Sequence, residues 1–176
     1  QKPVMHSGPR KNLTIVVLGE TSRAGNFSLG GYDRETNPRL QQDDVVYFPK
    51  TTSCGTATAV SVPCMFSNMP RAHYDEELAH HQEGVLDILQ RAGVQVLWND
   101  NDGGCKGACD RVPHQNVTDL HLSGQCIDGE CYDEVLFHNL DSYIDNLKQD
   151  GIIVLHTIGS HGPTYYKIGR ASCRER

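Results

Sequence analysis

The stretch NLTIVVLGE, residues 12–20, contains a short run of apolar residues that ends in a glycine and a glutamate. A continuous apolar run of this length predicts a β-strand that is buried on both faces. Comparable runs occur at residues 94–98 (VQVLW) and 152–156 (IIVLH). The sequence therefore predicts three buried strands.

Two segments between these strands have helical spacing of apolar residues. Residues 74–92 begin with acidic side chains, which suit a helix N-terminus, and stop at Gly93, and residues 133–149 are followed by Gly151. Strands that alternate with helices predict an α/β fold with a mainly parallel sheet flanked by helices, in which ligands bind beyond the carboxyl ends of the strands. The apolar positions are Leu78, Val85, Leu86 and Leu89 in the first segment and Val135, Leu136, Leu140, Ile144 and Leu147 in the second.

The composition predicts one domain and excludes some partners. The 176 residues carry a formal net charge of −6 without any block of lysine and arginine, which argues against a nucleic-acid partner. No apolar run is long enough to span a membrane, and the first 12 residues lack the apolar core of a signal peptide. We therefore expect the chain to start inside a longer protein.

Six of the seven cysteines lie in close pairs, which are Cys54 with Cys64, Cys105 with Cys109, and Cys126 with Cys131. Their spacing does not match that of structural zinc sites, so we expect local disulfides formed in an oxidising compartment. Proximity alone supports this pairing. The seventh, Cys173, lies in IGRASCRER, residues 168–176, which resembles translated sequencing-adapter DNA. We expect a domain over residues 1–167 and a non-native tail over 168–176, with an ordinary basic tail as the alternative.

Each predicted strand is followed by a polar loop that contains glycine. These loops are GETSR at 19–23, NDNDGGCKG at 99–107 and HTIGSHGP at 156–163. Carboxyl ends of parallel strands share one edge of a sheet, so the three loops should form a site. Glu20 ends a buried strand, where a carboxylate is costly unless it is paired or binds a metal. We interpret it as a metal ligand, with a helix cap or a salt bridge to Arg23 as the alternative.

The stretch TTSCGTATAVSVPCMF, residues 51–66, is rich in small hydroxyl side chains. Small residues from Thr56 to Val62 predict the start of a helix that Pro63 ends or kinks. A hydroxyl at this helix end could attack a phosphoryl group if a divalent metal lowers its pKa. Spacing alone does not choose among Ser53, Thr56 and Thr58, and these hydroxyls could equally serve as caps.

Other candidate ligands lie in the same loops. Lys106 is in a glycine-rich loop suited to holding a phosphate oxygen, and His161 is a candidate metal or phosphate ligand. His156 is close enough to its strand to be a buried structural histidine. His80 and His81 lie on a predicted helix surface, where we expect solvated side chains.

Four motifs carry a specific resemblance to a known family. They are GETSRAGNFSLGGYDRETNPRL (19–40), TTSCGTATAVSVPCMFS (51–67), CKGACDRVP (105–113) and HTIGSHGPTYYK (156–167). Together they resemble the catalytic domain of the lipid A phosphoethanolamine transferases over residues 12–167. The resemblance implies an alkaline-phosphatase/sulfatase-like fold, incomplete here. It also implies a periplasmic location at the bacterial inner membrane, to which a further N-terminal domain anchors the protein.

The resemblance also implies a mechanism and a set of site residues. Thr58 matches the family nucleophile, which takes phosphoethanolamine from phosphatidylethanolamine and passes it to a lipid A phosphate, lowering the binding of polymyxin and colistin. Glu20 and Thr58 match zinc ligands, and His161 matches a residue near a second zinc ion. The residues that match the surroundings of the phosphoethanolamine are Lys106, Asn101, Asp102 and His161. Because the family completes its zinc site in a later DHG segment, we expect this chain alone to bind zinc weakly and not to turn over.

Three alternatives remain at this point. A related transferase could act on another glycan, and a sulfatase-like phosphodiesterase could share the fold. Sulfatases use a Cys/Ser-x-Pro-x-Arg context, which the segment CGTAT at 54–58 lacks. A disulfide-stapled extracellular binding module would explain the cysteines but not the three polar loops.

Overall fold

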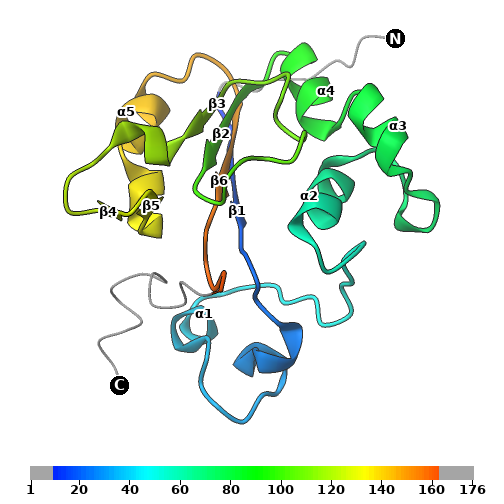
Figure 1. Ribbon diagram of the computed structural model, residues 1–176, viewed down its shortest axis with the longest axis vertical. Helices are drawn as coiled ribbons and strands as arrows, with labels where there is room; N and C mark the ends of the chain where they lie inside the picture. Colours follow the sequence, from blue (N-terminus) through cyan, green and yellow to red (C-terminus); the bar gives the residue numbers. More distant parts are fainter. Residues whose placement is uncertain (1–9, 163–176) are drawn as a thin grey trace.

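A computed structural model describes residues 10–162 as a sheet covered by helices on both faces (Figure 1). The sheet has the order β1-β6-β2-β3, and all of its neighbouring strands are parallel. The expected α/β fold with a parallel sheet is therefore confirmed. The expected tail at 168–176 lies outside the described residues. The strands are β1 (Leu13–Leu18), β2 (Gln95–Asp100), β3 (His114–Asn116) and β6 (Gly151–His156).

A short strand of the sheet and a short hairpin were not predicted from the sequence. The three residues of β3 have the sequence HQN, which lacks the apolar character of a buried strand. A separate antiparallel hairpin pairs β4 (Cys126–Ile127) with β5 (Glu130–Cys131). Both elements are too short to produce a period in the sequence.

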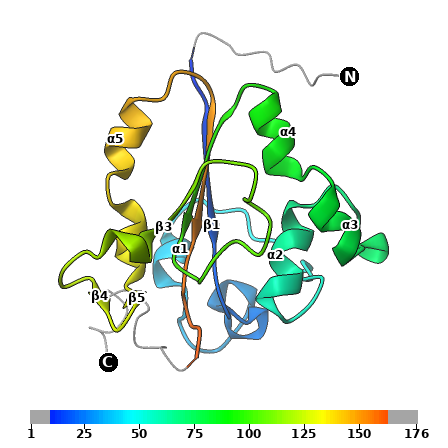
Figure 2. The ribbon, with the colours of Figure 1, turned by 45° about the horizontal axis from the view of Figure 1, so that its top comes forward.

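Helices on the two faces enclose separate cores (Figures 1 and 2). On one face, α2 (Thr58–Phe66) and α4 (Val85–Arg91) pack over Trp98 and Val154. On the other, the 3₁₀ helix η5 (Asp133–Phe137) and α5 (Leu140–Asp145) pack over Ile153 and Leu155. All six residues of β6 are buried, so this strand lies between the two cores.

Strand β1 is not buried on both faces as predicted. Among residues 10–162 it pairs with β6 alone, at the edge of the sheet. Val16 and Leu18 pack into the core beneath α2 and α4, but Leu13, Ile15 and Val17 are exposed. Successive side chains of a strand point to opposite faces. The helices that cover β6 on the second face do not reach β1.

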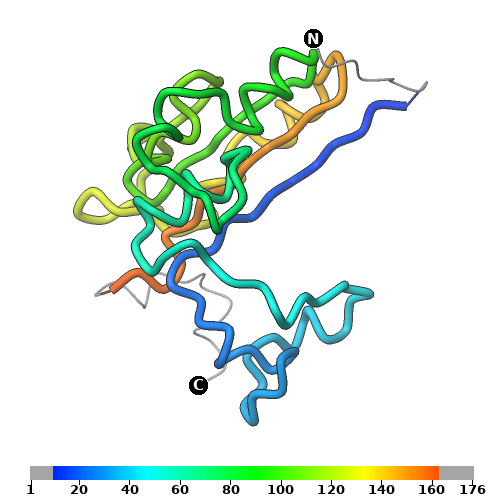
Figure 3. The backbone as a smooth tube through the Cα atoms, turned by 90° about the vertical axis from the view of Figure 1, so that its right-hand side faces the viewer, coloured from blue at the N-terminus to red at the C-terminus, as the bar shows by residue number. Residues whose placement is uncertain are grey.

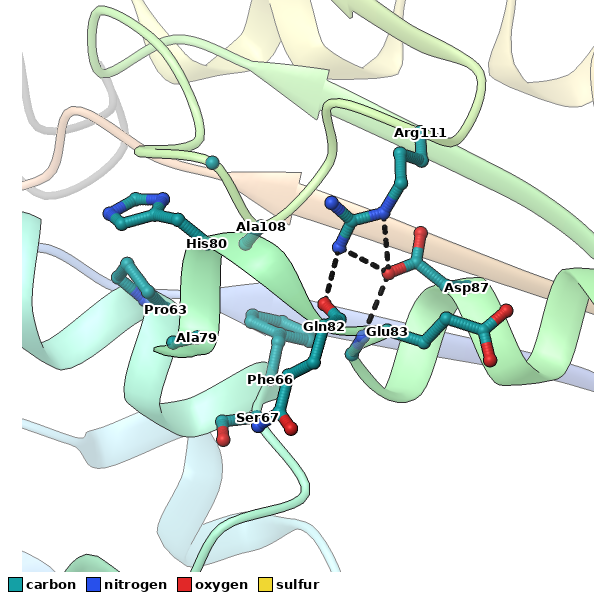
Figure 4. A pocket seen from close by; sticks show the side chains of 12 residues that line it. Pro63, Phe66, Ser67, Ala79, His80, Gln82, Glu83, Asp87, Ala108 and Arg111 are labelled. Atoms are coloured by element: carbon teal, nitrogen blue, oxygen red, sulfur yellow. Dashed lines mark hydrogen bonds and ion pairs between the residues drawn. The ribbon is translucent and has the colours of Figure 1, made fainter. Parts of the chain in front are cut away.

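The helix predicted at 74–92 is in fact two helices, α3 (Glu76–His81) and α4, which are separated near Gly84. The reason is a close contact, because a Cβ atom at Gly84 would lie 2.8 Å from the carbonyl oxygen of Phe66. Asp87 fixes the break by accepting the Gly84 N–H at 2.8 Å. Figure 4 shows Arg111 reaching the same carboxylate of Asp87 at 2.8 Å and the carbonyl of Gln82. One consequence is that Leu78, expected in the core, is exposed.

We expect Gly84→Ala to destabilise the fold by about 1–3 kcal/mol, because the added methyl group must displace backbone rather than a flexible side chain. Chemical denaturation would measure the loss. Gly25→Ala is the matched control, since the nearest atom to its Cβ would be the Arg23 side chain at 3.8 Å. Equal stability of the two variants would show that the close contact at Gly84 does not govern the break.

The helix predicted at 133–149 is also divided. Asn139 has a φ of 57°, a left-handed conformation that separates η5 from α5. The predicted apolar positions still face the core: Val135, Leu136, Leu140 and Leu147 are buried, and Ile144 is partly buried. The pattern of burial was thus predicted correctly while the continuous helix was not.

Helix α2 begins two residues later than predicted and is not ended by Pro63. It continues to Phe66, with Val62, Pro63, Cys64 and Phe66 buried. A disulfide between Cys54 and Cys64 ties its second half to the preceding loop. Packing and this crosslink maintain the helix despite the hydrogen bond that a proline removes.

The segment after β1 leaves the body of the sheet before the chain returns to α2 (Figure 3). It contains two 3₁₀ helices, η1 (Ala24–Asn26) and η2 (Ser28–Gly30), and the short α1 (Pro38–Gln42). Further 3₁₀ turns occur at η3 (Arg71–His73) and η4 (Val117–Leu120). Across residues 10–162, every helix is too short or too polar to cross a bilayer.

Candidate catalytic and metal-binding site

The three loops after β1, β2 and β6 meet at one edge of the sheet, as predicted. The Asn101 N–H donates to the His156 carbonyl at 2.9 Å, and the Ser160 N–H donates to the Glu20 carbonyl at 3.3 Å. Gly159 has a φ of +49°, and a Cβ atom there would lie 2.8 Å from the Glu20 carbonyl oxygen. Only glycine allows the third loop to approach Glu20 this closely.

Thr58 and Glu20 are the first pair of predicted site residues that the fold brings together. Thr58 is the first residue of α2, and its Oγ1 donates a hydrogen bond of 3.0 Å to Glu20 Oε2 across 38 positions of sequence. Glu20 Oε1 accepts a second bond from Thr21 at 2.7 Å. The ion pair with Arg23 that we considered as an alternative is absent from the ion pairs of residues 10–162. Ser53 instead accepts the N–H of Gly55 in a local turn.

The surroundings of Glu20 favour its charged form. Burial acts to raise the pKa of Glu20, but the hydrogen bonds from Thr21 and Thr58 and the charges of His161 and His156 together lower this pKa below its usual value. Glu20 is therefore a carboxylate at neutral pH. This carboxylate can accept a hydrogen bond from a hydroxyl group or bind a cation.

Asp100, the last residue of β2, forms the structural centre of the site although the sequence analysis did not single it out. Its Oδ1 accepts the N–H groups of Asp102 at 2.9 Å and Gly104 at 2.7 Å. Its Oδ2 accepts Trp98 Nε1–H and His156 Nδ1–H, both at 2.8 Å. Burial acts to raise the pKa of Asp100, but the hydrogen bonds from His156, Trp98 and Gly104, together with the charge of His156, lower this pKa to about 2.

Asp102 has the opposite electrostatic character. Burial, together with the charges of Glu20 and Asp100, raises the pKa of Asp102 to about 6, although the charges of His156 and His161 act to lower it. Asp102 Oδ2 lies 3.5 Å from His156 Nε2. Donor atoms of Glu20, Asp102 and His156 all lie within 4.8 Å of one another. These three side chains can therefore share one cation.

The other predicted site residues, Lys106, His161 and Asn101, lie on the loops after β2 and β6 and differ in burial and in their hydrogen-bond partners. Lys106 Nζ donates to the Gly103 carbonyl at 3.1 Å, and His161 is exposed. Asn101 is buried and donates its amide to the Cys131 carbonyl at 3.0 Å and to Asp133 at 2.9 Å. The structure therefore gives the Asn101 amide a supporting contact, and its role toward a substrate stays a prediction.

Asp133 is a second supporting residue that the sequence analysis missed. Besides Asn101, its carboxylate accepts the N–H groups of Ile158 at 2.8 Å and Gly159 at 3.0 Å. It therefore links the start of η5 to the loops after β2 and β6. In the sequence, Asp133 lies only at the start of a predicted helix, and nothing in that position indicates this contact.

The cysteines form the three predicted disulfides, Cys54–Cys64, Cys105–Cys109 and Cys126–Cys131. Cys105, Cys109 and Asp110 are close enough to one another to resemble a metal site. Because the two sulfurs are bonded to each other, they are not thiolate ligands. The disulfides instead brace the loops around the site.

Comparison with known proteins identifies the family of the fold. A sequence model of the Sulfatase family matches residues 12–169. The phosphoethanolamine transferase EptA of Salmonella typhimurium is 80% identical over 166 residues, which make up 94% of this chain. This chain spans only 30% of the length of that relative.

Two solved structures from Neisseria meningitidis have the same fold. One is the soluble domain of lipooligosaccharide phosphoethanolamine transferase A, with a TM-score of 0.89 and 48% identity over 96% of this chain and 51% of that one. The other is the integral membrane protein of that name, with a TM-score of 0.90 and 47% identity over 97% of this chain and 32% of that one. The family match covers most of the sequence and the fold agrees with both structures, so this chain belongs to the Sulfatase family.

Proposed function

We propose that the protein is a zinc-dependent phosphoethanolamine transferase that moves the group from phosphatidylethanolamine to a lipid A phosphate. The observation that carries the proposal is the contact of Thr58 Oγ1 with Glu20 Oε2 at 3.0 Å, which places a hydroxyl against a carboxylate at the loop edge of the sheet. The relatives are named phosphoethanolamine transferases, and these names indicate which group is transferred. A location at the periplasmic face of the bacterial inner membrane, with a membrane-anchoring domain, agrees with the disulfides and with the integral membrane relative.

The residues fit a zinc ion. Glu20 and Thr58 would be its ligands from this chain, and His161 would serve a second ion, because carboxylate oxygen and imidazole nitrogen are usual zinc donors. A bound zinc ion lowers the pKa of a coordinated hydroxyl and offsets negative charge on a phosphoryl group. Glu20 already orients the hydroxyl of Thr58 through their hydrogen bond of 3.0 Å.

Transfer would proceed by two substitutions at phosphorus. The Thr58 oxygen gives up its proton and attacks the phosphorus of phosphatidylethanolamine; the bond to the diacylglycerol oxygen breaks, and that oxygen takes a proton. The phosphoethanolamine is then esterified to Thr58, at the positive end of the α2 dipole. A lipid A phosphate oxygen next attacks the same phosphorus, and Thr58 leaves and regains a proton. Lys106, Asn101, Asp102 and His161 would surround the transferred group.

The function can be tested with the full-length protein, phosphatidylethanolamine carrying an isotope-labelled headgroup, and purified lipopolysaccharide. We expect mass spectrometry to find the labelled phosphoethanolamine on lipid A. Label on the core sugars or on another glycan, with lipid A unmodified, would instead support the related transferases. Release of the labelled headgroup to water would support a phosphodiesterase, and no reaction with any acceptor would support a binding module. Lower binding of colistin to the modified lipid A is the expected downstream effect.

A further inference from the structure

Asp133, at the start of η5, is the point at which two of the three site loops are tied together. On the loop after β6, its Oδ1 accepts the Ile158 N–H at 2.8 Å and its Oδ2 accepts the Gly159 N–H at 3.0 Å. On the loop after β2, its Oδ1 also accepts the Asn101 side-chain amide at 2.9 Å. One side chain therefore holds both loops.

Within residues 10–162, no other group shares these contacts on the loop after β6. The N–H groups of Ile158 and Gly159 there donate to Asp133 and to no other atom. Ile158 is buried, and a buried N–H group that loses its acceptor keeps the cost of losing water. The position of this loop therefore depends on the Asp133 side chain.

The contacts require a carboxylate at position 133, because all three partners are donors. The Asn101 amide also donates to the Cys131 carbonyl at 3.0 Å, so its nitrogen faces two acceptors and its orientation is fixed. An asparagine in place of Asp133 would offer one oxygen and one NH₂ group. In either orientation this NH₂ group would face a donor, so the change should loosen the loops while keeping the shape of the side chain.

The loop that Asp133 holds lies directly against Glu20. A Cβ atom at Gly159 would lie 2.8 Å from the Glu20 carbonyl oxygen and 3.1 Å from its backbone nitrogen. The Ser160 N–H donates to the same carbonyl at 3.3 Å. Glu20 Oε2 in turn accepts the Thr58 hydroxyl at 3.0 Å. A displacement of the loop after β6 would therefore move Glu20 and, with it, the Thr58 hydroxyl.

We propose that Asp133 is a positioning residue of the transfer reaction, which holds the loop after β6 against Glu20 and so keeps the Thr58 hydroxyl in place for attack on phosphorus. This inference rests on the proposed function, because it takes Thr58 as the nucleophile. Asp133 acts through Gly159 and Glu20 and is not itself a catalytic residue. Misplacing a reacting group by about 1 Å can slow a reaction about 100-fold, which sets the scale of the expected effect.

The first half of the reaction tests this role. The full-length protein is mixed with saturating phosphatidylethanolamine that carries an isotope-labelled headgroup, without an acceptor, and mass spectrometry of quenched samples follows the label on the protein. The rate constant of labelling reports the placement of the Thr58 hydroxyl, whereas the final amplitude reports the folded fraction. In Asp133→Asn, we expect the rate constant to fall about 10- to 100-fold. A residue with a purely structural role would lower the amplitude and leave the rate constant unchanged.

The matched control is Asp141→Asn, the same chemical change at an exposed acid in the first turn of α5, which should alter neither quantity. If Asp133→Asn gives no folded protein, Asp133→Glu decides alone. It keeps the acceptor atoms but moves them outward by one methylene group, and its rate constant should fall at least about threefold. An unchanged rate constant in the folded variant would overturn the inference and leave the proposed function intact. Absence of label on the unchanged protein would overturn the proposed function, and this inference with it.

Discussion

Thr58→Ala should reduce phosphoethanolamine transfer by at least about 1,000-fold, because it removes the oxygen that we propose forms the covalent intermediate. The side chain of Thr58 is small, and within residues 10–162 its hydrogen bond is the one to Glu20, so the fold should tolerate the change. The measurement is the initial rate of labelled product formation on lipid A by the full-length protein. A binding module would keep its function in this variant.

Three further variants make this result specific. Thr58→Ser keeps a hydroxyl at the same position and should retain measurable transfer. Thr56→Ala and Ser53→Ala remove the two hydroxyls that the sequence could not distinguish from Thr58, and both should transfer at nearly the normal rate. Transfer that persists in Thr58→Ala but disappears in Thr56→Ala or Ser53→Ala would reassign the nucleophile.

The sheet could be predicted because its central strands are consecutive apolar residues. Residues 95–98 of the predicted 94–98 lie in β2, and residues 152–156 lie in β6, which is buried along its whole length. The breaks in the two predicted helices were not predictable from spacing. One depends on the approach of Gly84 to a carbonyl of another helix, and the other on a left-handed Asn139, and neither changes the apolar period.

The candidate site shows a similar division. Glu20 and His161 were singled out because they lie in polar loops that follow apolar strands, and Asp102 was singled out through the family resemblance. Asp133 was missed because it accepts the backbone N–H groups of Ile158 and Gly159, which lie on a distant loop. Asp100 was missed because its contact with His156 joins two strands far apart in the sequence, although its contacts with Trp98, Asp102 and Gly104 are local. The burial of His156 was anticipated, but the direction of its two nitrogens depends on the strand order, since β6 and β2 must be neighbours for it to meet Asp100.

Trp98→Ala should destabilise the protein by about 3–5 kcal/mol, the usual cost of deleting a fully buried tryptophan. Trp98 is 0% exposed and packs edge-on against Phe66 at 5.1 Å and His156 at 5.6 Å between ring centroids. Its loss would leave a cavity between α2 and the sheet and would free one side of the His156 ring. The measurement is the free energy of unfolding from chemical denaturation, with the zinc affinity measured on the same sample.

Trp98→Phe separates the packing of Trp98 from its hydrogen bond. The phenyl ring keeps much of the buried area but cannot donate to Asp100 Oδ2, which still accepts His156 Nδ1. We therefore expect a smaller loss of about 1–2 kcal/mol. If Trp98→Phe costs as much as Trp98→Ala, the hydrogen bond to Asp100 rather than the packing holds this region together. If neither variant is destabilised, the core beneath the site does not depend on Trp98, and the orientation of His156 must come from Asp100 alone.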